Sequence, residues 1–482
     1  MHIALVSRVL GLLLMLFSFT MLVPALVALI YRDNSEYAFL GSFAIILCTG
    51  LLFWLPVRNR RENLSIRDGF LVTVSFWTVL GFCGAFPFLF AQQPELSFVD
   101  AAFEAISGLT TTGATVIQGL DTLPKSILYY RQQLQWLGGM GIVVLAIAVL
   151  PMLGVGGMQL FRTETSGPIK DSKITPRITE TAKALWYLYL GLTATCALAY
   201  WFAGMDLFDA IAHSFATVSI GGFSTHDASI GYFASPAIEL VAIIFIVLSG
   251  ISFALHFNVL RQRSLRPYLE NTESQTYLLI LLVVTLVSWL VLYLDEDHEL
   301  VVALRHGIFM TVSIATTTGF AIADHSAWAG FLPFLLFFCS FAVCCAGSTG
   351  GGIKLIRLIL IFKQGNLEIK RLIHPHAVIP IKIGHKPVPD RVMDAVWGFF
   401  SVYILTFALL FVAVLATGLD PLTAFSAVAA CINNLGPGLG RVALHYGDIN
   451  EVAKWILCFA MLIGRLEIFT LLVLFSPMFW QK

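Results

Sequence analysis

Four short glycine-containing segments recur along this chain of 482 residues, and each follows a short stretch of predicted helix. They are the triplets Thr111-Thr112-Gly113, Ile220-Gly221-Gly222, Thr317-Thr318-Gly319 and Asn434-Leu435-Gly436. Their last residues, here called the reference glycines, are successively 109, 97 and 117 residues apart. This spacing is too long for a solenoid, whose repeats are roughly 20–50 residues. Glycine lets successive carbonyl groups point to one side, and carbonyl oxygens can replace the water around a cation. The segments therefore predict four quarters of one pore.

The composition places the chain in a membrane. It is 58% hydrophobic and 12% charged, whereas soluble domains carry about 25% charged residues. The formal net charge of +0 gives no reason to expect a nucleic-acid partner, and membrane lipids are the expected surroundings. The eight cysteines lie in or beside apolar runs without a CxxC pair, so we expect them to pack as small apolar side chains.

Ten apolar runs are long enough to cross the hydrocarbon core, which takes about 20 helical residues. They are residues 9–30, 38–56, 69–91, 132–154, 183–204, 237–259, 276–294, 330–361, 393–417 and 453–475. Four shorter apolar stretches, each leading into a glycine segment, lie at about 100–111, 208–219, 303–316 and 421–433. Non-helical backbone at membrane depth must be buried in protein or line a cavity, so these stretches are predicted to be re-entrant half-helices.

The expected fold is therefore an all-α polytopic membrane protein with about ten transmembrane helices and four re-entrant pore half-helices. Residues 1–68 hold two helices outside the repeat, and four pseudo-fourfold pore repeats follow around one pore. The repeats are residues 69–178, 179–268, 269–390 and 391–482. Each repeat begins and ends on the same side of the membrane, which favours a fourfold pore over the inverted repeats of many secondary transporters.

The charges in the loops predict the orientation. Lys and Arg gather in alternate loops, for example at Arg58, Arg162 and Arg261, and the opposite loops hold acids such as Asp33 and Glu95. Basic loops stay in the cytoplasm. Both termini are therefore predicted to be cytoplasmic, and the glycine segments are entered from outside. Arg131 is an exception, because it falls on the outer side.

Acidic and threonine residues also stand at a fixed distance from the reference glycines. Asp100, Asp209 and Thr423 lie thirteen residues before them. These residue types cap helix N-termini, so we expect them to start three of the half-helices. Asp420, just before Pro421, is another ordinary start signal.

The residues around the glycines resemble the TrkH/TrkG subunit of bacterial Trk potassium uptake systems, within the Trk/Ktr/HKT family. The resemblance covers essentially the whole chain. It is carried by SGLTTTGAT, SIGGFSTHD, ATTTGFA and NNLGPGLG at the four reference glycines, with CAGSTGGGIK at 345–354 and GRLEIFTLL at 464–472. It implies that the four triplets form a potassium-binding filter, each a degenerate counterpart of the TVGYG sequence of potassium channels. The second and fourth triplets depart most from Thr-Thr-Gly. A serine at position 113 is associated with sodium transport in plant relatives, so Gly113 argues for potassium.

A gate is predicted inside the eighth apolar run. A lipid-facing helix would be unstable here, because the run contains Gly347, Gly350, Gly351 and Gly352. The functional interpretation is a flexible intramembrane loop beneath the third segment, and the alternative is a simple break that turns the chain. Arg465 lies inside the last apolar run, where a charge usually faces the protein interior with a partner. The resemblance implies that Arg465 contacts the glycine loop, whereas a plain structural ion pair is the alternative.

The predicted function is potassium uptake through a carbonyl-lined filter. A sodium- or proton-coupled symporter of the same fold is the alternative, although few acids lie at membrane depth to relay protons. An intramembrane enzyme is disfavoured, because the chain has no GxSxG, no HExxH and no paired acids inside the apolar runs. The longest inner loop, residues 363–392, is too short for a nucleotide-binding domain. The resemblance implies a cytoplasmic TrkA-like nucleotide-binding subunit, a homodimer and the bacterial inner membrane. Potassium is the expected substrate, and no cofactor is expected in this chain.

Overall fold

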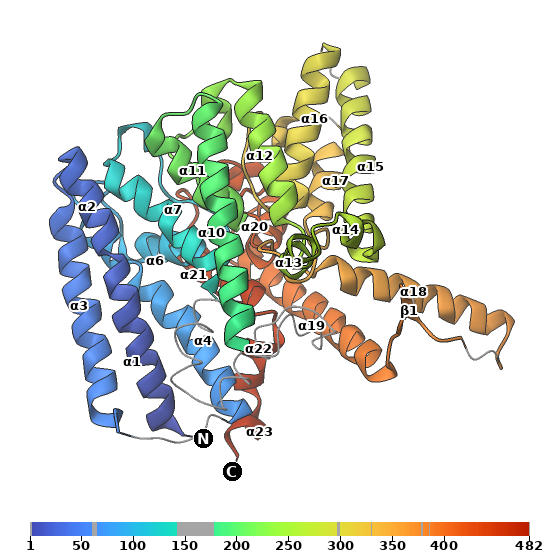
Figure 1. The fold of residues 1–482 in the computed structure, drawn as a ribbon, viewed down its shortest axis with the longest axis horizontal. Coiled ribbons are helices and arrows are strands. Elements are labelled where there is room, and N and C mark those ends of the chain that lie inside the picture. Colours follow the sequence, from blue (N-terminus) through green and yellow to red (C-terminus); the bar gives the residue numbers. More distant parts are fainter. Residues whose placement is uncertain are drawn as a thin grey trace.

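The computed structural model describes residues 2–59, 65–141, 178–295, 299–328, 330–376, 379–384 and 386–481. Within these ranges the chain is built from helices, apart from a hairpin in which β1 (Lys382–Ile383) pairs antiparallel with β2 (Lys386–Pro387). The two ends of the chain lie at the same end of the molecule (Figure 1). Arg162, one of the basic residues from which the orientation was predicted, lies outside the described residues, as does the second half of the predicted 132–154 helix.

The first three helices form one edge of the molecule, at the left of Figure 1. They are α1 (Ile3–Thr20), α2 (Leu22–Tyr31) and α3 (Glu36–Trp54), and the 3₁₀ turn η1 (Leu55–Val57) ends the third. Glycines let α1 and α3 pack closely. A Cβ on Gly11 would lie 2.7 Å from the Gly50 carbonyl oxygen, and one on Gly50 would lie 2.8 Å from the Gly11 oxygen. Small residues at such crossings are how membrane helices approach each other.

The rest of the chain alternates long helices with short ones. The first half holds α4 (Ile66–Cys83), α5 (Phe86–Phe90), α6 (Phe98–Leu109), α7 (Lys125–Gly139), α10 (Ile178–Phe202), α11 (Leu207–Ser219), α12 (Pro236–Ser249) and α13 (Phe253–Gln262). The second half holds α14 (Arg266–Glu270), α15 (Thr272–Asp295), α16 (Leu300–Ala315), α17 (Leu332–Cys339), α18 (Leu355–Ile373), α19 (Asp390–Leu415), α20 (Pro421–Ile432), α21 (Glu451–Arg465), α22 (Phe469–Leu472) and α23 (Pro477–Trp480). Further 3₁₀ turns are η2 (Leu120–Thr122), η4 (Ser229–Phe233), η5 (His325–Ala327), η6 (Gly440–Val442) and η7 (Val473–Phe475).

The described residues contain six helices long and apolar enough to cross a membrane, and two bent helix pairs bring the number to eight. The predicted run 237–259 is bent by 93° between α12 and α13, and the run 453–475 is bent by 107° after α21. The run 330–361 is not one helix either, because residues 340–354 form a loop between α17 and α18. The chain is an integral multi-pass membrane protein, as the composition predicted.

Four short helices, α6, α11, α16 and α20, precede the glycine segments. They have 12, 13, 16 and 12 residues, too few to cross the hydrocarbon core. Ser97, Asp206 and Asp420 cap three of them, each accepting a hydrogen bond from the backbone N–H three residues later. The expected caps at Asp100, Asp209 and Thr423 were wrong by three residues, whereas the start signal at Asp420 is confirmed. Asp100, Asp209 and Thr423 supply the capped N–H groups instead.

We predict that the α1–α3 contact tolerates no added methyl group. Gly50→Ala should destabilise the protein by about 1–3 kcal/mol through overpacking. Gly41→Ala is the matched control in the same helix, because its Cβ would meet only Phe90 Cδ2 at 4.0 Å. Thermal unfolding in detergent measures both. Equal melting temperatures for the two variants would contradict the close packing.

Candidate ion-binding site

Each of the four short helices ends with the same backbone turn. The residue two before the reference glycine has a positive φ in every case, namely 55° at Thr111, 54° at Ile220, 64° at Thr317 and 54° at Asn434. The next backbone N–H donates to the carbonyl five residues earlier, over 2.9 Å at Thr112 and Gly221 and 2.8 Å at Thr318 and Leu435. This is the Schellman helix end, whose left-handed residue is usually glycine. A non-glycine residue there costs about 1–3 kcal/mol, so the surroundings must hold all four turns in place.

The four segments close into a ring. The reference glycines also have positive φ, at 81°, 79°, 83° and 94° in chain order. A Cβ on any of them would come within 3.0 Å of a carbonyl oxygen in the next segment. Gly113 faces the Gly221 oxygen, Gly222 faces that of Thr318, Gly319 faces that of Leu435, and Gly436 returns to that of Thr112. The structure therefore brings all four predicted triplets together, in chain order, around one centre.

The ring is buried, and the C-terminal ends of the four short helices lead into it. The polar residues of the triplets are at most 1% exposed; they are Thr111, Thr112, Thr317, Thr318 and Asn434. A helix C-terminus carries about half a negative charge on its unpaired carbonyl groups. Four such ends around one centre form an electrostatically favourable place for a cation without any ionised side chain in the triplets.

Threonine hydroxyl groups brace the first and third segments in the same way. The hydroxyls of Thr110 and Thr112 hydrogen-bond each other over 2.7 Å, and those of Thr316 and Thr318 over 2.8 Å. Thr110 also donates to the Ile106 carbonyl over 2.7 Å. These contacts are local, so each Thr-Thr-Thr-Gly sequence stiffens its own turn.

The second segment lacks these hydroxyls and is held by α7. Gln135 Nε2 donates to the Gly221 carbonyl over 2.6 Å, and its Oε1 accepts from the backbone N–H of Phe223 over 3.0 Å. The Gln135 side chain therefore hydrogen-bonds the residues on both sides of Gly222. Sequence reasoning missed Gln135, although three glutamines within one apolar run were a signal that α7 has a buried polar face.

The fourth segment is held by its own asparagine. Asn434 Nδ2 donates to Thr112 Oγ1 over 2.9 Å and to the Met461 carbonyl over 3.1 Å. Two donated bonds fix the orientation of this amide, which leaves its Oδ1 without a hydrogen-bond partner among the described residues. Tyr446 also donates to the Gly436 carbonyl over 2.8 Å. The two divergent triplets thus keep the shared backbone turn by contacts from other parts of the chain.

The glycine-rich loop, residues 340–354, lies against three of the four segments. Thr349 Oγ1 donates to the Val218 carbonyl over 3.0 Å, and the Cys344 thiol donates to the Thr316 carbonyl over 3.1 Å. The Gly351 N–H donates to Thr317 Oγ1 over 2.8 Å. A Cβ on Gly351 would also overlap the Asn433 carbonyl oxygen. The predicted gate glycines therefore lie at the helix-end side of the ring.

The ends of the glycine-rich loop are also tied down. Gly347 has a φ of 77°, and its carbonyl accepts from the Phe253 N–H over 3.0 Å. Glu273 Oε1 accepts from the N–H groups of Ala346 at 2.8 Å and Ile356 at 3.2 Å. Both ends of the loop are therefore held in place, in addition to its contacts with the ring.

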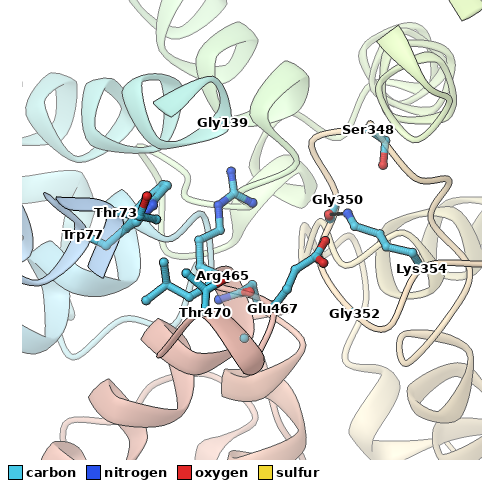
Figure 2. A pocket seen from close by; sticks show the side chains of 14 residues that line it. Thr73, Trp77, Gly139, Ser348, Gly350, Gly352, Lys354, Arg465, Glu467 and Thr470 are labelled. Carbon is cyan, nitrogen blue, oxygen red and sulfur yellow. Dashed lines mark hydrogen bonds between the residues drawn. The ribbon is translucent and has the colours of Figure 1, made fainter. Parts of the chain in front are cut away.

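Arg465 connects this loop to the first quarter of the molecule. Its Nη1 donates to the Thr349 carbonyl over 3.2 Å and its Nη2 to the Gly138 carbonyl over 2.7 Å. A cavity of about 70 Å³ lies beside it, lined by Gly350, Gly351, Gly352 and Asn434 among others. Figure 2 shows Arg465 and Glu467 entering this cavity, with Lys354 across from them. The cavity therefore lies beside the loop and the fourth triplet, and its lining includes the charged residues Lys354, Arg465 and Glu467.

Two of the acids near the starts of the short helices are paired. Lys454 donates to Asp100 over 2.6 Å, and His226 lies 3.2 Å from Asp209. Asp121 contacts the other nitrogen of His226. The Asp209–His226 contact links α11 to the chain that follows its segment, whereas the Lys454–Asp100 pair links α6 to α21. Among the described residues no group of three or more His, Cys, Asp or Glu side chains could hold a metal ion.

A family model described as a cation transport protein, TrkH, matches residues 35–482. The chain belongs to the TrkH family. It is 58% identical over 482 residues to the Trk system potassium uptake protein TrkH of Halomonas elongata, and the match covers both chains completely. It is 54% identical over 483 residues to TrkH of Escherichia coli, again with full coverage of both. The crystal structure of the potassium transporter TrkH from Vibrio parahaemolyticus, 53% identical, matches with a TM-score of 0.91 over 100% of both chains.

These comparisons confirm the predicted family and the predicted fold class. The relatives also include the Trk system potassium uptake protein TrkG of Escherichia coli, which is 43% identical over 482 residues and covered to 99%. All of these names belong to transport proteins rather than enzymes.

We predict that the ring loses potassium binding when one reference glycine gains a methyl group. Gly113→Ala would push a Cβ against the Gly221 oxygen. Gly119→Ala is the matched control, because Gly119 also has a positive φ, 73°, but its Cβ would meet only Thr122 Oγ1 at 3.7 Å. Both variants carry the strain of a left-handed alanine, about 1–2 kcal/mol. Only Gly113→Ala should lose the rise in melting temperature that added potassium gives to a protein that binds it. An unchanged rise in Gly113→Ala would contradict the ring.

Proposed function

We propose that this chain takes up potassium by conducting it through the ring of the four segments. The observation that carries the proposal is the closed order of the ring, in which each reference glycine touches the next segment and the fourth returns to the first. Carbonyl oxygens around one axis can replace the hydration shell of a cation. No ionised side chain belongs to the triplets, so the ion would be held without being trapped. The names of the relatives support potassium as the substrate.

The twelve filter residues of this proposal are the four triplets 111–113, 220–222, 317–319 and 434–436. The close contacts between neighbouring segments would resist contraction around a smaller ion, which favours potassium over sodium. The recurrence of a short helix followed by a triplet supports the division of the chain into repeats. Residues 1–68 stand outside the repeats, and the four pore repeats are residues 69–178, 179–268, 269–390 and 391–482. Each repeat contributes one short helix and one triplet.

We further propose that the glycine-rich loop closes the inner side of the ring. The bonds of Thr349 and Gly351 to the short-helix ends hold the loop in place, and Arg465 adds a third anchor. A guanidinium group beside the cavity would repel a cation arriving from the ring. Each hydrogen bond contributes only about 0.5–1.5 kcal/mol net. A partner that binds the protein could therefore supply the energy needed to open the loop.

We also propose regulation by a cytoplasmic TrkA-like nucleotide-binding subunit and a homodimer of the membrane chain in the bacterial inner membrane, as the family resemblance implies. The relatives are named as proteins of a Trk system, which implies further components. Arg67 donates to the backbone carbonyl of Gln481 over 2.5 Å, so a basic side chain lies beside the C-terminal end. Because basic loops stay in the cytoplasm, this contact supports a cytoplasmic position for both termini.

Rubidium uptake by the purified protein in liposomes tests the proposed function. We expect rubidium to enter down its own gradient and potassium to compete with it, whereas sodium should compete poorly. The uptake should not depend on a proton or sodium gradient. Absence of rubidium uptake in both the wild type and the Arg465→Ala variant, whose proposed gate is weakened, would overturn the proposal. A strict requirement for one of these gradients would favour the coupled symporter instead.

We predict that Arg465→Ala raises the basal rubidium flux measured without any partner. The substitution removes both the anchor on the Thr349 carbonyl and the positive charge beside the cavity. Arg371→Ala is a suitable control, because it removes the same charge far from the loop. The Arg371 side chain is 47% exposed on α18. Deleting residues 350–352 should have the same effect as Arg465→Ala. A loss of flux in a folded Arg465→Ala protein would show that Arg465 is structural rather than part of a gate.

A further inference from the structure

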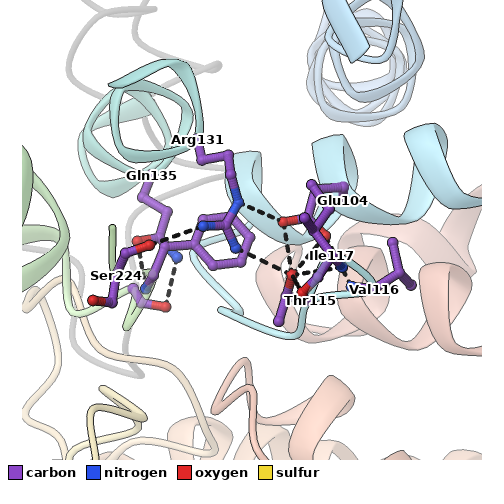
Figure 3. A network of polar contacts seen from close by, with 9 residues as sticks. Glu104, Thr115, Val116, Ile117, Arg131, Gln135 and Ser224 are labelled. Atoms are coloured by element: carbon purple, nitrogen blue, oxygen red, sulfur yellow. Dashed lines mark hydrogen bonds and ion pairs between the residues drawn. The ribbon is translucent and has the colours of Figure 1, made fainter. Parts of the chain in front are cut away.

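The helix α7 carries two buried polar side chains, Arg131 and Gln135, that contact the backbone of the second segment and the residues after it. Arg131 and Gln135 are one helical turn apart, and Figure 3 shows both extending from α7 toward the segments. Arg131 is 1% exposed, and the side chain of Glu104 beside it is fully buried. Charges at membrane depth are costly and usually mark functional positions. The proposed filter and gate do not use this pair.

The guanidinium group of Arg131 reaches three different acceptors. Its Nε donates to Glu104 Oε1 over 2.8 Å, and its Nη2 donates to Thr115 Oγ1 over 3.1 Å. Its Nη1 donates to the Ser224 carbonyl over 2.9 Å. Thr115 and Ser224 each lie two residues after a reference glycine, in the first and second segments respectively. One rigid group therefore fixes equivalent positions of two neighbouring quarters.

Glu104 completes the link within the first quarter. It lies on α6 and accepts hydrogen bonds from the Val116 N–H and from the Thr115 hydroxyl, each over 3.0 Å. The helix that leads into the first segment is thus tied to the chain that leaves it. Figure 3 shows these bonds as one continuous network that runs from Glu104 through Arg131 to Ser224.

Gln135 extends the network to the ring itself. The Gly221 oxygen that accepts from Gln135 is the same oxygen that faces Gly113. Arg131 also lies over the Phe223 ring, with 4.1 Å between the guanidinium carbon and the ring centre. Any shift of Arg131 or Gln135 would therefore change the distance between the first and second segments.

The other quarters do not repeat this charged pair. Glu104 stands nine residues before its reference glycine, and the equivalent positions hold His213, Met310 and Ala427. His213 contacts Ser224 Oγ over 2.9 Å, which is a neutral version of the same brace. The boundary between the first and second quarters is therefore set by a buried ion pair.

We propose that Arg131, paired with Glu104 and assisted by Gln135, positions the first two segments and so determines ion selectivity. It is a positioning residue, because it contacts the segments from behind. This inference rests on the proposed function, since it assigns selectivity to the same ring. Arginine suits this role because its planar guanidinium presents five donors in a fixed fork, whereas lysine carries one compact ammonium group on a flexible stem.

The test uses Arg131→Lys in the full chain, reconstituted in liposomes. Lysine keeps the positive charge beside Glu104 but loses the fork that reaches Ser224. We expect rubidium uptake to remain and the preference for rubidium over sodium to fall roughly tenfold, the effect of losing one hydrogen bond to a charged group. Gln135→Met, which keeps the side-chain length and removes both bonds to the second segment, should lower the preference in the same direction.

Arg305→Lys is the matched control. Arg305 also pairs with a glutamate, Glu239, over 2.6 Å from its Nε, but this pair joins α16 to α12 and does not touch the triplets. The preference of the Arg305→Lys variant for rubidium over sodium should equal that of the wild type. Melting temperatures in detergent report folding for every variant, and Gln135→Met decides the outcome if Arg131→Lys does not fold.

Two results would overturn the inference. One is an unchanged preference in folded Arg131→Lys and Gln135→Met proteins, and the other is an equal loss in Arg305→Lys. These results are distinct from a failure of the proposed function, in which neither the wild type nor the Arg465→Ala variant would carry rubidium.

Discussion

Backbone that leaves a helix inside a membrane must find its hydrogen-bond partners within the protein, and this constraint organises the whole structure. Four short helices end at the same left-handed turn, and each turn is followed by a glycine that faces a carbonyl group of the next segment. A side chain at any of the four glycines would force two segments apart. The surrounding helices, the side-chain braces and the glycine-rich loop all act on this one ring.

The ring is nearly fourfold in its backbone but not in its side chains. The first and third segments are braced by their own threonine hydroxyls, whereas the second depends on Gln135 and the fourth on the fixed amide of Asn434. The glycine-rich loop lies against three quarters, and Arg465 reaches it from the last. Similar backbone turns are therefore held by different interactions, so substitutions in different quarters should have different consequences.

Much of the fold could be predicted, because length, hydropathy and glycine spacing are local properties of the sequence. The bends of 93° and 107° were missed, since hydropathy does not record a break in a helix whose residues stay apolar. Three helix caps were misplaced by three residues, because Ser97, Asp206 and Asp420 are capping residue types too, and a fixed spacing from the glycines does not choose between two such candidates. Arg131 appeared only as a positive charge on the unexpected side. Its partners Glu104 and Ser224 lie 27 and 93 residues away, and such contacts cannot be read from one sequence.

The central claim is that the four segments bind a cation at their common centre. Anomalous X-ray diffraction from crystals grown with rubidium tests this claim most directly, because rubidium replaces potassium and can be located without ambiguity. The ring predicts a rubidium peak on its axis, within ligand distance of carbonyl oxygens from all four triplets. Rubidium bound elsewhere in the protein, with no peak inside the ring, would contradict the claim.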